Sequence, residues 1–144
     1  MTAMLEAVRS GGALTAQPRP PLVLTRRRGR VELRLVCVAM GRDLSVTLDG
    51  GDRPHIGAVA VAQPRPSHRG GGRISATTSV IALLGHLEDE LARSTAHRLA
   101  SGLDATVSVA CGIHLDQAGP DDLREVRELA EELATELLAI ANGS

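Results

Sequence analysis

The chain contains no phenylalanine, tyrosine or tryptophan, and all sixteen of its basic residues are arginine. Aliphatic side chains must therefore fill the core, and apolar residues make up 43% of the 144 positions. The missing aromatic rings remove the platforms on which proteins stack nucleobases, and a net charge of −1 gives no general attraction for nucleic acid. The missing lysine excludes catalysis through a Schiff base. We expect neither nucleic-acid binding nor lysine-dependent catalysis.

Cysteine and long apolar runs are also scarce. Cys37 and Cys111 lie in apolar stretches without the Cys or His neighbours of a metal-binding motif, so we expect buried thiols in a reducing compartment rather than a disulfide. No run approaches the roughly 20 residues needed to span a membrane, and the N-terminus lacks the apolar segment of a signal peptide. A cytoplasmic protein without membrane contact is the simplest expectation.

The first 30 residues differ in composition from the rest. They combine Gly11-Gly12, the run Pro18–Pro21 and an arginine cluster at positions 26–28, which predicts a flexible N-terminal arm. We interpret the cluster as solvated, with an acidic partner or nucleic acid as the alternative. Residues 31–144 are predicted to form a single α+β domain.

Alternation of apolar and polar residues predicts strands over residues 31–40, 44–49, 55–62, 74–84 and 105–114. Apolar residues at every third or fourth position predict helices over about 86–102 and from Pro120 to about 142. Residues 63–73, rich in glycine and proline, are predicted to be a flexible loop. The order β-β-β-β-α-β-α predicts an α+β fold, with a mainly antiparallel sheet of about five strands and two helices on one face.

The first predicted helix has two distinct sides. Its leucines at 87, 91, 99 and 103, with Thr95, form a buried stripe, and this turns His86, Glu90, Arg93 and His97 onto the opposite ridge. The ridge then faces either water or a partner.

Two kinds of site fit the residues around this helix. His86 and Glu90 stand one turn apart and could ligate a divalent ion, completed by His114 and Asp116 from a strand end. Alternatively, the free backbone N–H groups at the helix start at His86 could bind a phosphate. Arg53, Ser75 and Ser79 are candidate auxiliaries for that phosphate. The alternative to both sites is a solvated surface, which also accounts for Ser75 and Ser79 on one strand face.

Four segments at consistent spacing resemble the LpdD-like family of prenylated flavin chaperones, which includes the accessory subunit of gallate decarboxylase. The resemblance covers about residues 31–140 and is carried by Gly50–Ala60, Ser75–Val80, Gly85–Glu90 and Gly112–Asp116.

The resemblance implies a non-catalytic protein that binds prenylated flavin mononucleotide (FMN) and assists its maturation or its delivery to a UbiD-type decarboxylase. Flavin prenyltransferase is a second expected partner. By resemblance, the residues that line the cofactor or an associated metal are His55, Ser79, His86, Glu90 and His114. The phosphate is expected at Arg53 and the helix start.

Two other functions stay open. One is a small enzyme that uses a divalent metal held by His86, Glu90 and His114 to activate water. The other is a purely structural subunit of a decarboxylase. A homodimer is a further expectation, because the predicted sheet has two free edges.

Overall fold

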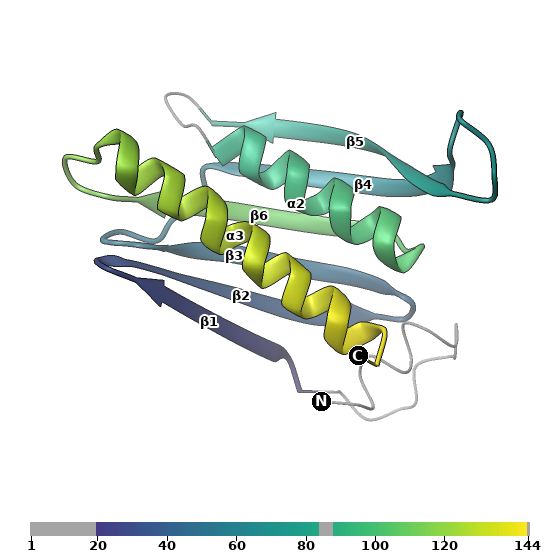
Figure 1. The fold of residues 1–144 in the computed structure, drawn as a ribbon, viewed down its shortest axis with the longest axis horizontal. Coiled ribbons are helices and arrows are strands. Elements are labelled where there is room, and N and C mark those ends of the chain that lie inside the picture. The colour runs from purple at the N-terminus through teal and green to yellow at the C-terminus, as the bar shows by residue number, and fades with distance from the viewer. Residues whose placement is uncertain (1–19, 84–87, 144) are drawn as a thin grey trace.

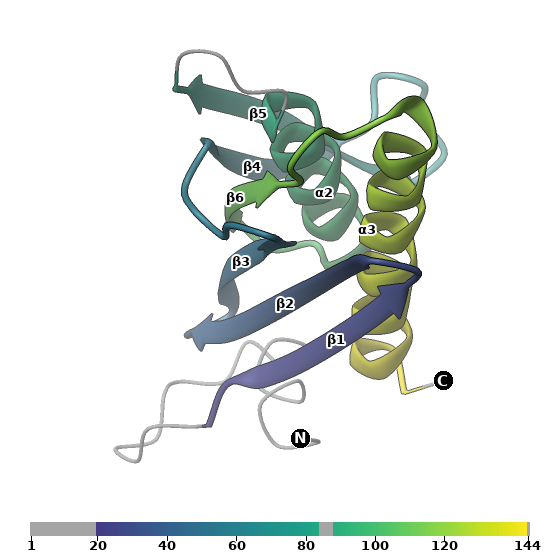
Figure 2. The ribbon, with the colours of Figure 1, turned by 90° about the vertical axis from the view of Figure 1, so that its left-hand side faces the viewer.

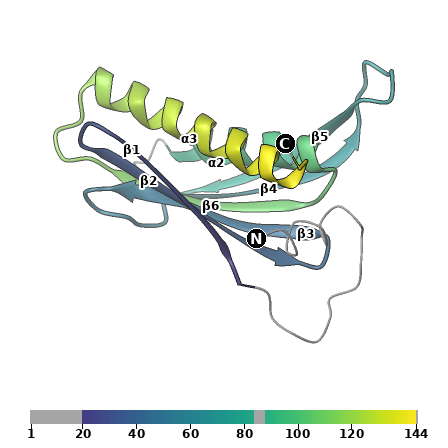
Figure 3. The same ribbon diagram turned by 60° about the horizontal axis from the view of Figure 1, so that its bottom comes forward.

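The computed structural model describes residues 20–83 and 88–143, which form one sheet with two helices packed on the same face (Figures 1 and 3). The helices are α2 (Glu88–Leu103) and α3 (Pro120–Ala141). The strands are β1 (Leu22–Arg28), β2 (Val31–Met40), β3 (Asp43–Gly51), β4 (Ala58–Pro66), β5 (Ile74–Ala82) and β6 (Val107–His114).

The strands lie in the order β1-β2-β3-β6-β4-β5. β3 and β6 pair in parallel, and the other neighbouring strands pair antiparallel. α2 covers the half of the sheet that contains β4 and β5, and α3 crosses the half that contains β1 and β2 (Figure 1). The predicted α+β fold is confirmed, with six strands in place of about five.

The sixth strand is β1, which falls inside the predicted arm of residues 1–30. The prediction of a flexible arm is therefore wrong for Leu22–Arg28, because Leu22 and Leu24 are buried and the strand pairs with β2 along its length. Figure 2 shows β1 at the edge of the sheet, beside α3. Residues 1–19 lie outside the described residues.

The arginine cluster of β1 is not simply solvated. Arg26 contacts Glu132 and Glu136 of α3 at 3.1 and 3.2 Å, and Arg28 contacts Glu132 at 2.6 Å. Arg28 also reaches Glu125 and Glu128. The acidic partner of the cluster is thus a helix of the same chain, about 100 residues later.

The predicted loop of residues 63–73 is shorter than expected, since β4 continues through Pro64 to Pro66. A proline lacks the N–H that a central strand needs. The pairing of β4 with β6 ends at Ala62 and Val107, so Pro64 and Pro66 pair only with β5. One side of β4 is therefore a free edge there, where proline is tolerated.

The core lies between the sheet and the helices and is aliphatic apart from Cys37 and Cys111, as the composition predicts. Its largest fully buried side chains include Leu33, Leu35 and Leu48 of the sheet and Leu99, Leu133 and Leu137 of the helices. Alanines dominate the α2 contact, where Leu91 and Leu103 of the predicted stripe are only half-buried.

Both cysteines are buried and free, as predicted, and burial raises the pKa of each thiol to about 12. Neither helix in the described part of the chain has the length and apolar character of a membrane span.

Replacing Leu133 by alanine should lower the free energy of unfolding by about 2–5 kcal/mol, because the side chain is fully buried and leaves a cavity. Urea unfolding followed by circular dichroism measures this. Leu83 is 52% exposed, so Leu83→Ala is the matched control and should stay within about 0.5 kcal/mol of the parent protein. Equal losses in the two variants would contradict the core described above.

Candidate functional site

The connection between β3 and β4 lies across the end of β6. The backbone N–H groups of Asp52 and Arg53 donate to the His114 carbonyl at 2.6 and 3.3 Å, and Gly57 N–H donates to the Cys111 carbonyl at 2.8 Å. Both ends of this six-residue connection are thus fixed to one strand. His55, at its centre, is held in place.

His55 meets a buried carboxylate at the start of α2. Its Nε2 lies 3.2 Å from Glu88 Oε1, and its Nδ1 lies 3.0 Å from the Arg53 carbonyl oxygen. Only 7% of the Glu88 side chain is exposed, and its Oε1 also accepts the Ile113 backbone N–H at 3.4 Å. Both ring nitrogens of His55 thus face oxygen atoms, one of the Glu88 carboxylate and one of the Arg53 carbonyl.

Two glycines make room for this pair. A Cβ on Gly57 would lie 2.8 Å from the Glu88 carboxyl group and 3.2 Å from His55 Nε2. A Cβ on Gly112 would lie 1.6 Å from the His55 carbonyl oxygen, which no side chain can tolerate. The close packing around His55 therefore leaves room only for glycine at both positions.

A second cluster of charges flanks the pair at the exposed end of β6. Asp116 Oδ1 accepts from His114 Nε2 at 3.1 Å and from the Arg53 guanidinium at 2.7 Å. The Asp116 backbone N–H donates to Asp52 at 2.9 Å. The hydrogen bond from His114, followed by that from Arg53, holds the pKa of Asp116 below its usual value, so this carboxylate stays ionised at lower pH than a solvated one.

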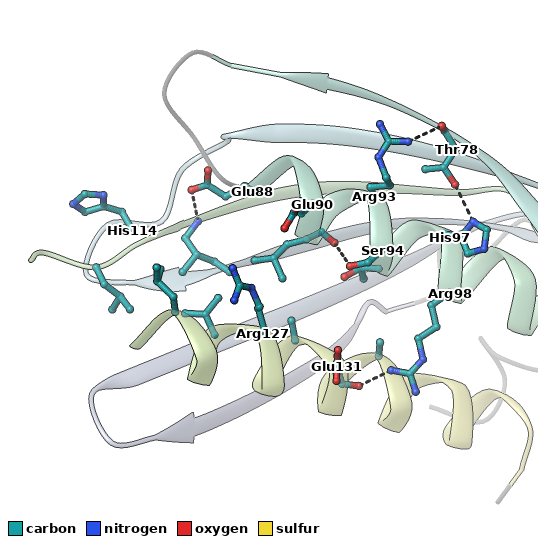
Figure 4. A pocket seen from close by; sticks show the side chains of 18 of the residues that line it. Thr78, Glu88, Glu90, Arg93, Ser94, His97, Arg98, His114, Arg127 and Glu131 are labelled. Atoms are coloured by element: carbon teal, nitrogen blue, oxygen red, sulfur yellow. Dashed lines mark hydrogen bonds between the residues drawn. The ribbon is translucent and has the colours of Figure 1, made fainter. Parts of the chain in front are cut away.

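An open depression of about 1130 Å³ surrounds the outer side of α2 (Figure 4). On one flank, Arg93 donates to the Thr78 carbonyl of β5, and His97 lies 3.4 Å from the Thr78 hydroxyl. The other flank faces α3, and we call it the helix groove. It is lined by Leu91 and Thr95 of α2 and by Leu123, Val126, Ala130 and Ala134 of α3.

The helix groove is apolar along its length and polar at both ends. Glu88 and His114 line one end, beside the His55 pair. At the other end, Arg98 reaches from α2 to the Glu131 carbonyl on α3 at 3.0 Å. Figure 4 shows Arg127 on α3 turned toward α2. Within the described residues Arg127 has no hydrogen-bond or ion-pair partner, so its guanidinium is available to an anion.

The predicted site residues fall into separate groups. Glu90 and His114 both line the depression. His55 does not line it but contacts Glu88, which does. Arg53 is engaged with Asp116.

Ser75 and Ser79 lie elsewhere. They alternate along β5 with Ala76 and Thr78, which face α2, so the two serines point to the opposite face of the sheet. They are not brought together with His55 or Glu88. His86, which was predicted for both the cofactor and the metal, lies outside the described residues, as do Gly85 and Leu87.

The described part of the chain gives no support to a metal centre. No group of three or more His, Cys, Asp or Glu side chains in residues 20–83 and 88–143 could hold a metal ion. Glu90 and His114, the two predicted metal ligands that are described, therefore form no such group.

Residue patterns alone missed three side chains of the site. Glu88 lies next to the ridge of exposed residues and was not singled out, although a carboxylate in the first helical turn is common. Arg98 and Arg127 belong to different helices, and only the packing of those helices brings them to one groove. Gly57, two residues after His55, was the available signal for a closely packed group.

Substituting Gly57 by alanine should lower the free energy of unfolding by about 1–3 kcal/mol, since the new methyl group must displace Glu88 or His55. Thermal and urea unfolding measure the loss. Gly119→Ala is the control, because no atom lies within 4 Å of the added Cβ. A Gly57→Ala protein as stable as the Gly119→Ala protein would show that the site is not tightly packed.

Comparison with known proteins shows the family of this chain and a solved structure with the same fold. A search of curated proteins finds no match. Among solved structures, a chain from a chaperone complex for yeast 20S proteasome assembly shares the fold. It superposes with a TM-score of 0.56 at 14% identity, covering 85% of this chain and 96% of that chain. The family model described as "Prenylated flavin chaperone LpdD-like domain" matches residues 27–142, so the chain belongs to that family.

Proposed function

We propose that this protein binds prenylated FMN in the helix groove and assists its maturation or its delivery to a UbiD-type decarboxylase, without catalysing decarboxylation itself. Family membership supports the flavin. The observation that carries the choice of site is the pairing of an apolar groove with an arginine that has no partner among the described residues.

The two parts of the cofactor need different surroundings. The dimethylbenzene part of the ring system and the prenyl-derived ring are apolar, and would lie against Leu91, Leu123, Val126 and Ala130. The phosphate is an anion, and Arg127 would bind it, since a guanidinium donates two parallel hydrogen bonds to phosphate oxygens. The groove therefore offers a matching group to each part.

The absence of aromatic residues is consistent with temporary holding. A flavin ring in this groove meets aliphatic side chains only, so it gains burial without the additional stabilisation of ring stacking. The depression is also open along its length rather than enclosed, so the cofactor could leave without unfolding of the chain. A carrier that transfers its ligand needs both a moderate affinity and an open path by which the ligand can leave.

The His55–Glu88 pair has a positioning role in this proposal. It fixes the first turn of α2 against β6, and Glu88 and His114 form the end of the groove. The pair thus sets the position of α2 relative to α3 and the width available to the ring system.

Cofactor binding is tested by mixing the purified protein with prenylated FMN under anaerobic conditions and desalting the mixture. The expected result is a flavin-like visible spectrum that stays with the protein. Arg127→Ala should weaken binding at least about tenfold, because one charge-assisted contact with phosphate is lost. Arg124→Ala removes an arginine that is 61% exposed and lies outside the groove, and binding should not change. Colourless protein after desalting would refute the proposal.

The phosphate assignment has its own test, in which the protein is titrated with FMN and with riboflavin, which lacks the phosphate. The parent protein should prefer FMN, and Arg127→Ala should remove most of that preference while riboflavin affinity stays the same. If Arg127→Ala weakens both ligands equally, the residue supports the groove structurally and the phosphate lies elsewhere.

Delivery is tested by adding the loaded protein to a UbiD-type decarboxylase that has been prepared without cofactor. Decarboxylase activity should appear faster than with the same amount of free prenylated FMN, and the loaded protein alone should turn over no substrate. Equal activation by free and carried cofactor would exclude delivery. Turnover by the protein alone would instead favour an enzyme.

A further inference from the structure

The face of the sheet opposite the helices is covered by no described element, and we call it the open face (Figure 3). Two neighbouring rows of side chains cross it. One row spans all six strands and consists of Val23, Val36, Thr47, Ala110, Val59 and Ile81. The other spans five strands and consists of Val38, Ser45, Ser108, Val61 and Ser79.

These two rows contain no charged residue. The chain has sixteen arginines and seventeen acidic residues, yet none of them falls among these eleven positions. Antiparallel sheets with one face in water usually carry polar and charged side chains on that face. Here the two rows carry serine and threonine beside valine, isoleucine and alanine, and the apolar members are typical of sheet faces that pack against another protein layer.

Several apolar side chains of the open face are strongly exposed. Ile81 is 75% exposed, Val23 52% and Val61 46%. Single exposed apolar residues are ordinary on protein surfaces, but a continuous row across six strands is a patch, and patches mark interaction surfaces.

The open face is large enough for a stable dimer. Six strands about 4.8 Å apart are roughly 24 Å wide, and the two uncharged rows with one flanking row on each side extend roughly 20 Å along the strands. The resulting plane of roughly 500 Å², with the relief of its side chains added, is of the same order as the ~800 Å² that each partner contributes to a standard interface.

We propose that the open face binds the open face of a second copy of this chain, so that two sheets stack in the centre of a symmetric dimer with the helices outside. Stacked sheets lie about 10 Å apart with strands about 30° from parallel, and their valine and isoleucine side chains interdigitate. This arrangement buries both patches at once. It is independent of the flavin proposal, because the helix groove lies on the other side of the sheet.

The charges beside the rows favour a copy of the chain over a different partner. Arg34 and Asp49 adjoin the first row and pair with each other at 3.3 Å, and Arg27 and Glu32 lie 4.0 Å apart. These four charges beside the rows thus pair within the face. A face that is neutral and apolar matches itself, and a two-fold axis brings the same patch to both sides of the interface.

This proposal gives Ser79 a different role from the cofactor contact that the family resemblance implies. Its hydroxyl lies in the second row, opposite Val61, on the face away from the helix groove. In the dimer it would contact the second copy. Ser75, which alternates in phase with Ser79 on β5, would lie at the margin of the same interface.

The test is the mass of the protein in solution, measured by sedimentation and light scattering over a range of concentrations. The parent protein should have about twice the chain mass of 15.1 kDa. Val61→Arg should produce a monomer and raise the dissociation constant at least about 100-fold, because each copy then places an unpaired charge in the apolar interface.

Ile74→Arg is the matched control. Ile74 is also a β-branched residue on a neighbouring strand and is 37% exposed, but it alternates onto the helix side of β5. This variant should stay dimeric. A monomeric parent protein would overturn the proposal, as would a dimer that survives Val61→Arg or that Ile74→Arg disrupts equally. Prenylated FMN binding by Val61→Arg should equal that of the parent, which separates this test from that of the flavin site.

Cross-linking provides a second test that does not depend on the folding of an arginine variant. Both natural cysteines are fully buried, so an introduced surface cysteine is the reactive one. Thr47→Cys, in the middle of the first row, should form a covalent dimer with a bis-maleimide that spans about 10 Å. Ser94→Cys, exposed on α2, should not. Equal cross-linking of both variants, or of neither, would exclude the stacked arrangement.

Discussion

The buried carboxylate of Glu88 is the constraint on which the helix side of this molecule depends. It lies at the first turn of α2, where it contacts the His55 ring at 3.2 Å and accepts a hydrogen bond from the backbone of β6. A carboxylate that is removed from water needs such partners, because its desolvation is costly without them. The His55 loop is held to β6 by backbone hydrogen bonds at both ends, so Glu88 fixes the start of the helix to the centre of the sheet.

The shape of the groove follows from this attachment. α2 is held at its beginning by Glu88 and is joined to α3 farther along by the hydrogen bonds of Arg98. Between these points the helices meet through small or half-buried side chains, chiefly Leu91, Ala130 and Ala134, and a groove remains instead of a filled interface. The same alanines that keep this contact narrow leave room for a flat ligand. Polar contacts therefore hold α2 at the two ends of the groove, and small or half-buried side chains lie between the helices in its middle.

The sequence predicts the helices and strands of this fold better than it predicts the long-range contacts of their side chains. Period-two and helical patterns located five strands and both helices because those patterns are local. β1 was missed because its helix-facing side continues from Leu22 and Leu24 to Arg26 and Arg28, whose glutamate partners lie about 100 positions away on α3. Glu88 was missed for a similar reason, since its buried surroundings are supplied by the β3–β4 connection and β6. The sequence next to a charged residue does not show whether its side chain will be buried against a partner or exposed to water.

The serines of β5 fit two interpretations, and only the strand order decides between them. Alternating hydroxyls at Ser75 and Ser79 predicted either a polar pocket or a solvated face. The strand order decides which residues they join, since β4 and β6 place Val59, Val61 and Ala110 beside them and form an uncharged surface. The proposed cofactor site and the proposed self-association surface thus lie on opposite faces of one sheet. A substitution on either face should leave the other intact because the sheet lies between them, and the two proposals can be accepted or rejected independently.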